Sequence, residues 1–351
     1  MDSKTSLQAQ MLANRLQKRF RHLKKWAQKT NIGVFRLYDR DIPEIPLVLD
    51  FYGDGESSAL CGSLYKRPYE KDENEETCWL SAMKEAVSSA LNIKSEHIFL
   101  KQRQKQRGES QYEKMGRTRF EKTVMENGLS FKVNLSDYLD TGLFIDRRLL
   151  RAIVRTESAG KKVLNLFSYT GSFSVYAAAG GAVSTDSVDL SNTYLNWAQD
   201  NFLLNGFSAE LVKYFDDFFC KGSRDVHKLV CVDVLKFLDK AIAAKRRWDI
   251  IILDPPAFSN SKKMADNFDL SRDLTDLLIQ CLTLLSSGGK IFLSINLRRN
   301  APTAEELEIQ LRRKAPFADV RLTDLSGKIT DEDFKNRKIP KAYSLTAHQG
   351  S

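Results

Sequence analysis

Short apolar runs alternate with helical stretches along the second half of the chain, from about residue 126. The runs have the length of buried strands: "KVLNLFS", "AVSTDSVDL", "KLVCVDV", "WDIIILD" and "KIFLSIN". Helices are expected between them over 172–180, from Ser191 as N-cap to about Asn205-Gly206, and over roughly 271–285. This alternation predicts an α/β fold in which a parallel sheet carries helices on both faces.

The first 32 residues carry a different pattern, which predicts a basic helical arm. Apolar residues recur at spacings of three and four at Leu12, Leu16, Phe20, Leu23 and Ala27. No acidic residue occurs from Ser3 to Tyr38. We interpret the cations on this arm as phosphate contacts; the alternative is a docking helix with a solvated face. The predicted contacts are Arg15, Lys18, Arg19, Arg21, Lys24 and Lys25.

Residues 33–125 read as a small α+β module, and residues 126–351 as the α/β domain. In the module "VFRLYD", "LVLDFYGD" and "HIFLKQ" are strand-like, and "CWLSAMKEAVSSALNI" is helical. Lys101, Arg103, Lys105 and Arg107 then alternate at period two, so an extended chain would place all four on one face. They predict a basic loop that orders on a nucleic acid; a plain disordered loop is the alternative.

Composition narrows the partners and the compartment. The 351 residues carry a net charge of +9, which is compatible with a polyanionic partner. No apolar run approaches a membrane span, so no membrane association is expected. The five cysteines are scattered without a C-x-x-C pair, which favours a reducing, cytoplasmic location and no metal site.

The predicted strand ends carry the candidate chemistry, because ligands of doubly wound sheets bind beyond the carboxyl ends of the strands. Gly171 follows the first strand in a tight turn, "NLFSYTGSFSV", that lacks the glycine spacing of a dinucleotide site or a P-loop. The next three strands end at Asp189, at Asp233-Val234 and at Asp254. Together these residues predict an adenosine bound without phosphates. S-adenosylmethionine fits, since its cationic sulfonium favours an acidic pocket.

Several longer stretches share a resemblance to one family. They are "NRLQKRFRHLKKWA", "RLYDRDIPE", "VNLSDYLDTGLFIDRR", "NLFSYTGSFSVYAAAGGA", "DLSNTYLNWAQDNFLLNG" and "DPPAFSNSKKM". In this order, over about 14–300, the sequence resembles the bacterial 23S rRNA guanine-N7 methyltransferases, the RlmK half of the RlmKL family. The resemblance implies a Rossmann-like class I methyltransferase domain preceded by a basic helix and a small α+β domain. It also implies 23S rRNA or a large-subunit precursor as partner, and a second methyltransferase that is fused in relatives.

The resemblance also implies roles for individual residues. Those expected to bind the cofactor are Thr141, Gly142, Phe144 and Asp146 at its methionine end, Phe167, Ser168, Tyr169, Thr170 and Gly171 in the loop, Asp189, Leu190 and Ser191 near the ribose, and Asp233 and Val234 near the adenine. Those expected to face the target base are Asp254, Pro255, Pro256 and Phe258.

The residue chemistry limits which atom accepts the methyl group. Methylation of a pyrimidine C5 needs a cysteine nucleophile, and neither "LSINLRR" nor "DPPAFSNS" contains one. Guanine N7 and an exocyclic amine such as guanine N2 both remain compatible with the residues, and only the resemblance favours N7. At N7 the ring becomes cationic, which the Asp254 carboxylate would stabilise, while Phe258 would stack on the base. An rRNA-binding assembly factor without catalysis is the alternative from another class of protein.

Overall fold

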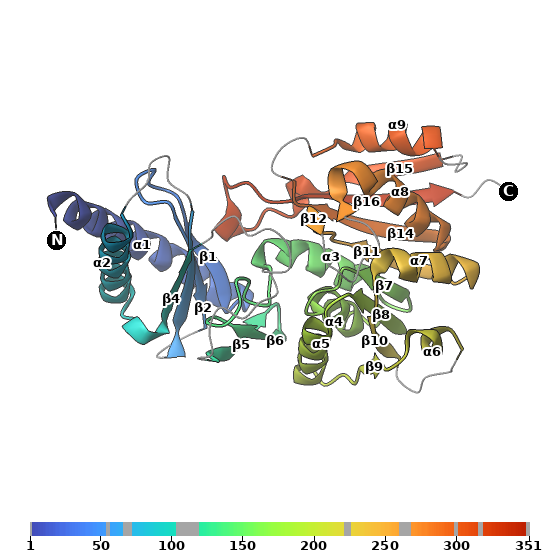
Figure 1. The fold of residues 1–351 in the computed structure, drawn as a ribbon, viewed down its shortest axis with the longest axis horizontal. Coiled ribbons are helices and arrows are strands. Elements are labelled where there is room, and N and C mark those ends of the chain that lie inside the picture. Colours follow the sequence, from blue (N-terminus) through green and yellow to red (C-terminus); the bar gives the residue numbers. More distant parts are fainter. Residues whose placement is uncertain are drawn as a thin grey trace. The chain divides into compact units, whose positions relative to one another are not determined.

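The computed structural model describes residues 2–53, 57–65, 72–102, 119–220, 226–259, 268–297, 301–314 and 319–348. It divides into two compact units (Figure 1). The first comprises Met1–Ile145 and Asp331–Arg337, and the second Asp146–Thr330 and Lys338–Ser351. Within the described ranges, no helix is both long and apolar enough to cross a membrane.

An eight-stranded sheet forms the centre of the second unit. Its strands are β7 (Lys162–Leu166), β8 (Ser184–Asp189), β9 (Glu210–Val212), β10 (His227–Cys231), β11 (Trp248–Leu253), β14 (Leu285–Ile295), β15 (Asp319–Asp324) and β16 (Lys341–His348). The order is β15-β16-β14-β11-β7-β8-β10-β9, and only β16 runs antiparallel to its neighbours. The predicted parallel sheet is therefore confirmed. The antiparallel pair β15–β16 was not predicted.

Helices cover both faces of this sheet (Figure 1). They are α3 (Arg148–Glu157), α4 (Ser172–Ala179), α5 (Asn192–Leu204), α6 (Phe215–Cys220), α7 (Val234–Ala243), α8 (Leu270–Thr283) and α9 (Ala304–Lys314). Alternate residues of β11 point to opposite faces: Ile251 and Leu253 pack with α7, α8 and α9, whereas Ile250 and Ile252 pack with α3 and α4. Burial on both faces explains why the four residues Ile250–Leu253 of β11 are all apolar.

The first unit is an α+β body. Its sheet has the order β1-β2-β3-β4, with β1 (Val34–Asp39), β2 (Leu47–Tyr52), β3 (Ala59–Leu64) and β4 (Ile98–Gln102). Two helices, α1 (Ser3–Thr30) and α2 (Glu73–Leu91), pack beside it. A separate hairpin joins β5 (Glu121–Glu126) to β6 (Leu129–Asn134) through Asn127-Gly128, both at positive φ, as such tight turns require. The short 3-10 turns are η2 (Ser95–His97), η4 (Ile145–Arg147), η5 (Ser326–Lys328) and η6 (Glu332–Phe334).

The predicted domain limits differ from this division. The helix over Ser3–Thr30 exists, but it is not a separate arm, because Leu12 and Leu16 are fully buried in the same core as the β1–β2 strands. The predicted limit after residue 125 would cut β5 at its pairing with β6. In the structure the first compact unit continues to Ile145.

A segment near the C-terminus, Asp331–Arg337, belongs to the first unit, which the sequence did not suggest. Asp333 is fully buried and accepts a hydrogen bond from the Arg36 backbone N–H at 2.9 Å. Arg337 forms an ion pair with Asp41 at 2.8 Å, and Asp41 also binds the Arg15 guanidinium at 2.7 Å. The segment is therefore held by a buried ion pair and a hydrogen bond to a buried carboxylate rather than by strand pairing.

Replacing Asp41 with alanine should destabilise the first unit, because it leaves Arg15 and Arg337 without their shared carboxylate. Loss of one partner of a buried pair typically costs about 3–5 kcal/mol. Burial alone raises the pKa of Asp41, but hydrogen bonds and charges from Arg15 and Arg337 outweigh it and hold the pKa below its usual value. The stabilisation is therefore present at neutral pH and lost as the pH falls through this lowered pKa.

Amide hydrogen exchange measured by mass spectrometry resolves the two units and checks this prediction. Peptides of the first unit should exchange faster in the Asp41→Ala variant, and those around β7 and β11 should not. The exposed Glu44→Ala substitution in the same connection is the control. Unchanged exchange in the first unit would contradict the role of Asp41.

Candidate functional site

The carboxyl ends of the central strands lie level with one another. Leu166 at the end of β7 pairs with Leu253 at the end of β11 and with Val188 in β8. The chain runs from β7 to β8 and β10 in one direction, and from β11 to β14 in the other. The strand order thus reverses between β7 and β11, which is where ligands bind in open α/β sheets.

The loop after β7 has an unusual backbone. Phe167, Tyr169 and Gly171 all have positive φ, at 56°, 51° and 71°. A side chain at Gly171 would be strained by this φ, and its Cβ would lie 2.8 Å from the Cβ of Ala198. Strain at two non-glycine residues is typical of a functional site. The buried Ser168 hydroxyl has no hydrogen-bond partner among the described residues, so it is suited to a bound ligand.

Asp189 ends β8 directly beside this loop. Its carboxylate accepts a hydrogen bond from the Tyr169 N–H at 2.9 Å and one from the Ser191 N–H at 2.9 Å. Burial raises the pKa of Asp189 to about 6, although these backbone donors lower it. A carboxylate has about four acceptor positions, so the backbone donors do not use all of them and ribose hydroxyls could also donate to Asp189.

Two of the predicted residues act as helix caps. Ser191 accepts from the Tyr194 N–H at 3.4 Å at the start of α5, which confirms its predicted capping role. One oxygen of Asp233 accepts from the Lys236 N–H at 3.1 Å and caps α7. Val234 is the first residue of α7 and is buried. The Leu190 carbonyl accepts from Cys231 at 3.6 Å, which joins the ends of β8 and β10. Contact of Asp233 with an adenine stays a prediction.

Asp254 is bound by an arginine that sequence reasoning missed. Arg147 donates from Nε to one Asp254 oxygen at 3.1 Å and from Nη2 to the other at 3.2 Å. It also pairs with Asp146 at 2.8 Å. Burial lowers the pKa of Arg147, but the two carboxylates outweigh this and raise it overall. The only signal in the sequence was the position of Arg147 inside "DTGLFIDRR".

This pairing changes the expected role of Asp254. A carboxylate held by both oxygens has a fixed plane, and part of its charge is compensated. Two carboxylates and one guanidinium leave the group Asp146, Arg147 and Asp254 with a formal charge of −1. The site therefore remains acidic, with the negative charge spread over two residues.

The residues after Asp254 form a short hairpin. Pro255 is buried and Pro256 partly buried. Phe258 lies in β12 (Phe258–Ser259), which pairs with β13 (Phe268–Asp269). Its ring is 50% exposed, so it is available for stacking on a base.

Three of the residues predicted to enclose the methionine end belong to the first unit. Thr141 forms a hydrogen bond with the Tyr52 hydroxyl at 2.9 Å, Gly142 has a φ of 97°, and Phe144 is 38% exposed. Asp146 is the first residue of the second unit. Contact of these residues with a cofactor stays a prediction.

The loop after β7 is also attached to α5. The Thr170 carbonyl in this loop accepts a hydrogen bond from the Asn201 side chain at 2.9 Å.

The predicted phosphate contacts fall into four groups. Lys101 is 7% exposed and donates to the Tyr138 carbonyl, which does not fit a phosphate contact. Arg15 pairs with Asp41, and Arg19 donates to the Leu37 carbonyl at 2.8 Å, so both are engaged within the unit. The predicted contacts on α1 that are exposed are Lys18, Arg21, Lys24 and Lys25. Arg103, Lys105 and Arg107 lie outside the described residues.

Comparison with known proteins places the chain in a family. A family model described as S-adenosylmethionine-dependent methyltransferase matches residues 54–320. Ribosomal RNA large subunit methyltransferase K of Neisseria meningitidis serogroup B is 42% identical over 95% of this chain and 86% of that protein. Ribosomal RNA large subunit methyltransferase K/L of Hahella chejuensis is 44% identical over 84% of this chain, which spans only 38% of that longer protein.

Solved structures agree with this placement. The crystal structure of SMU.776 complexed with SAH, described as a methyltransferase, matches with a TM-score of 0.70 and 25% identity, over 96% of this chain and 81% of that one. The SAM-dependent methyltransferase from Agrobacterium tumefaciens shares the fold, with a TM-score of 0.55 and 21% identity over 87% of this chain and 88% of that one. Three features after β7 and β8 fit an adenosine cofactor. They are the tight turn at Gly171, the Ser168 hydroxyl, which has no partner among the described residues, and the Asp189 carboxylate. The chain belongs to the S-adenosylmethionine-dependent methyltransferase family.

Proposed function

We propose that this protein transfers a methyl group from S-adenosylmethionine to guanine N7 in 23S rRNA. One observation carries the proposal: the loop 167–171, Asp189 and Asp254 lie at one level of the sheet, at the point where the strand order reverses. The chain that carries them is similar to a ribosomal RNA large subunit methyltransferase K over most of both lengths. We also propose that it works beside a second methyltransferase, since relatives named K/L are more than twice as long as the matched region.

Each residue of the site would have a separate role in methyl transfer. The cofactor, when bound, supplies the methyl group. Asp189 would accept hydrogen bonds from the ribose hydroxyls, and Ser168 would donate or accept beside it. Arg147 fixes the plane of Asp254, so that the target base meets an acceptor of constant orientation. Guanine N7 already presents an in-plane lone pair, so alignment contributes more than proton transfer.

A second candidate target is an exocyclic amine, guanine N2 foremost. The observation that favours it is the oriented Asp254 carboxylate, which could accept a hydrogen bond from such an amine. A cationic N7-methylated ring would gain less from Asp254 when Arg147 compensates part of its charge. The two targets give chemically different products, so one experiment separates them.

The decisive experiment is labelled methyl transfer to unmodified 23S rRNA, followed by borohydride reduction and aniline. We expect label in the RNA and a chain break at a single guanine, because N7 methylation makes the glycosidic bond labile. Label without a break would identify an amine product instead. Absence of label, with S-adenosylhomocysteine still bound, would contradict the enzymatic proposal and favour an RNA-binding assembly factor.

Cofactor affinity should depend on pH through Asp189. Its pKa is about 6, and only the ionised form can accept from two ribose hydroxyls while it holds its backbone donors. The dissociation constant of S-adenosylhomocysteine should therefore rise about tenfold from pH 7 to pH 5. Folding stability should show the opposite trend: a raised pKa means that the contribution of Asp189 to folding is present at low pH and lost as the pH rises through 6.

Isothermal calorimetry with S-adenosylhomocysteine between pH 5 and pH 8 measures the binding trend. The Asp189→Asn variant is the matched control, since its affinity should be weaker but nearly constant over this range. An affinity of the unmodified protein that does not change with pH would contradict the assignment of Asp189.

A further inference from the structure

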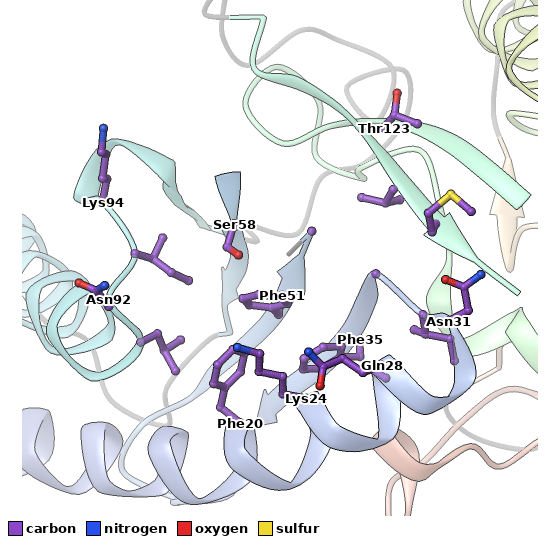
Figure 2. Close-up of a pocket in the computed structure, with 18 residues that line it drawn as sticks. Phe20, Lys24, Gln28, Asn31, Phe35, Phe51, Ser58, Asn92, Lys94 and Thr123 are labelled. Atoms are coloured by element: carbon purple, nitrogen blue, oxygen red, sulfur yellow. The ribbon is translucent and has the colours of Figure 1, made fainter. Parts of the chain in front are cut away.

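The first unit contains a cavity that the proposed methyl transfer does not use. Its volume is about 970 Å³, which lies in the range of small-ligand pockets. The second half of α1, the strands β1 and β2, the residues after α2 and the strand β5 form its wall (Figure 2). All of these elements lie between Met1 and Ile145, so the cavity belongs to one compact body.

Aromatic rings form one side of this cavity. Phe35 and Phe51 are stacked with 5.0 Å between their centroids, and both are nearly fully buried. Phe20 lies 5.0 Å from Phe51 and is only partly buried (Figure 2). Phe20 thus presents ring surface on a rigid aromatic support. Every nucleobase has a flat face that can stack on such a ring.

The charged side chains of the cavity wall all have the same sign. Lys24 and Lys94 line it, and no Asp or Glu is among the described residues that do so. The Lys24 ammonium lies 5.7 Å from the centroid of the Phe20 ring, so positive charge and aromatic surface are adjacent. This combination favours a ligand with an anionic part next to a flat part, and it disfavours a cationic ligand.

Amide side chains complete the wall. Asn31 caps the C-terminus of α1 and Asn92 caps that of α2, each with a φ of 54°. Both line the cavity, as does Gln28 one turn before the end of α1 (Figure 2). An amide offers a carbonyl acceptor and an NH₂ donor, and the edge of a base presents both kinds of group.

We infer that this cavity binds one unpaired nucleotide of the RNA substrate, with the base against Phe20 and the backbone phosphates near Lys24 and Lys94. The inference rests on the proposed function for the identity of the RNA. The nucleotide is unpaired because a base inside a duplex is stacked on both sides and cannot enter a concave site. The exposed cations Lys18, Arg21 and Lys25 lie on the same helix and extend the positive surface for the adjoining phosphates.

Two substitutions in the full chain separate the base contact from the phosphate contact. Phe20→Leu keeps an apolar side chain against Phe51 but removes the stacking surface, so it should weaken RNA binding about tenfold without changing the salt dependence. Lys24→Gln should reduce the slope of log affinity against log salt by about 0.7, the value for one phosphate contact on a single strand. Lys29→Gln is the matched control, because Lys29 is exposed on the same helix and does not line the cavity.

Three measurements are made on each variant: RNA affinity, the KM and kcat of labelled methyl transfer, and the affinity for S-adenosylhomocysteine. We expect Phe20→Leu to raise KM for RNA about tenfold, with kcat and cofactor affinity unchanged. Ultraviolet cross-linking of the unmodified protein to RNA should label the peptide that contains Phe20 or the one that contains Asn92.

The outcomes distinguish this inference from the proposed function. If the unmodified protein methylates RNA and both cavity variants bind RNA as it does, the cavity inference alone is wrong. If free GMP prevents the ultraviolet cross-linking of RNA to the cavity peptides, but the variants do not change RNA affinity, the cavity is a small-ligand site. The inference is then also wrong. If the unmodified protein transfers no methyl group to RNA, the proposed function is wrong. The inference is then wrong as well, because it takes its RNA ligand from that function.

Discussion

Replacing Arg147 with methionine should lower the unfolding free energy of the second unit by about 3–5 kcal/mol and reduce kcat by about 10²-fold. The Arg147 side chain is only 7% exposed and forms ion pairs with both Asp146 and Asp254, so it compensates one of their two negative charges. Methionine is shorter than arginine and uncharged, so it fills only part of the space and removes the guanidinium that both carboxylates share. The loss of kcat follows because Asp254 is no longer held in one plane, and small displacements of a positioning group are costly.

Two further variants separate charge from geometry at this position. Arg147→Lys keeps the positive charge but cannot bind both Asp254 oxygens in a fork, so it should retain most of the stability and lose most of the activity. Adding Asp254→Asn to Arg147→Met should restore part of the stability and none of the methyl transfer. Denaturation by urea and single-turnover kinetics measure the two effects. Full activity in Arg147→Met would contradict a positioning role.

Replacing Asp189 with alanine should weaken S-adenosylhomocysteine binding by at least about 100-fold. Two hydrogen bonds to a charged acceptor are lost, each worth about 1.5–3 kcal/mol. The N–H groups of Tyr169 and Ser191 also lose their acceptor, so the loop over Phe167–Gly171 is no longer tied to the end of β8.

Calorimetry measures this loss directly, with Asp239→Ala as the matched control. Asp239 is an exposed carboxylate on α7 that accepts a hydrogen bond from the Gln280 side chain at 2.9 Å and is not a predicted site residue. The control should bind the cofactor product as the unmodified protein does. A dissociation constant within fivefold of the unmodified protein for Asp189→Ala would show that the ribose is held elsewhere.

Much of the second unit could be predicted because its signals are local. Strands that are buried on both faces tend to be apolar runs, and each of the five stretches predicted as a strand became a strand of the sheet, within a few residues of its predicted limits. Ser191 caps α5 as its residue type and position indicated. The acids at the strand ends are consecutive with those strands, so finding the strands also located Asp189, Asp233 and Asp254.

The sequence by itself determined the parallel α/β core, the apolar stripe of α1 and the positions of the acids that end the strands, because each depends on residues close together in the chain. Three features depend on the tertiary structure alone. Arg147 donates hydrogen bonds to Asp254, Lys101 is buried, and the segment Asp331–Arg337 belongs to the first unit. The tertiary structure also decided that Phe20, Asn92 and Thr123 border one cavity. These contacts join residues tens to hundreds of positions apart. Hydrophobic periodicity specifies which face of an element is buried, but not which distant charge or ring will meet it there.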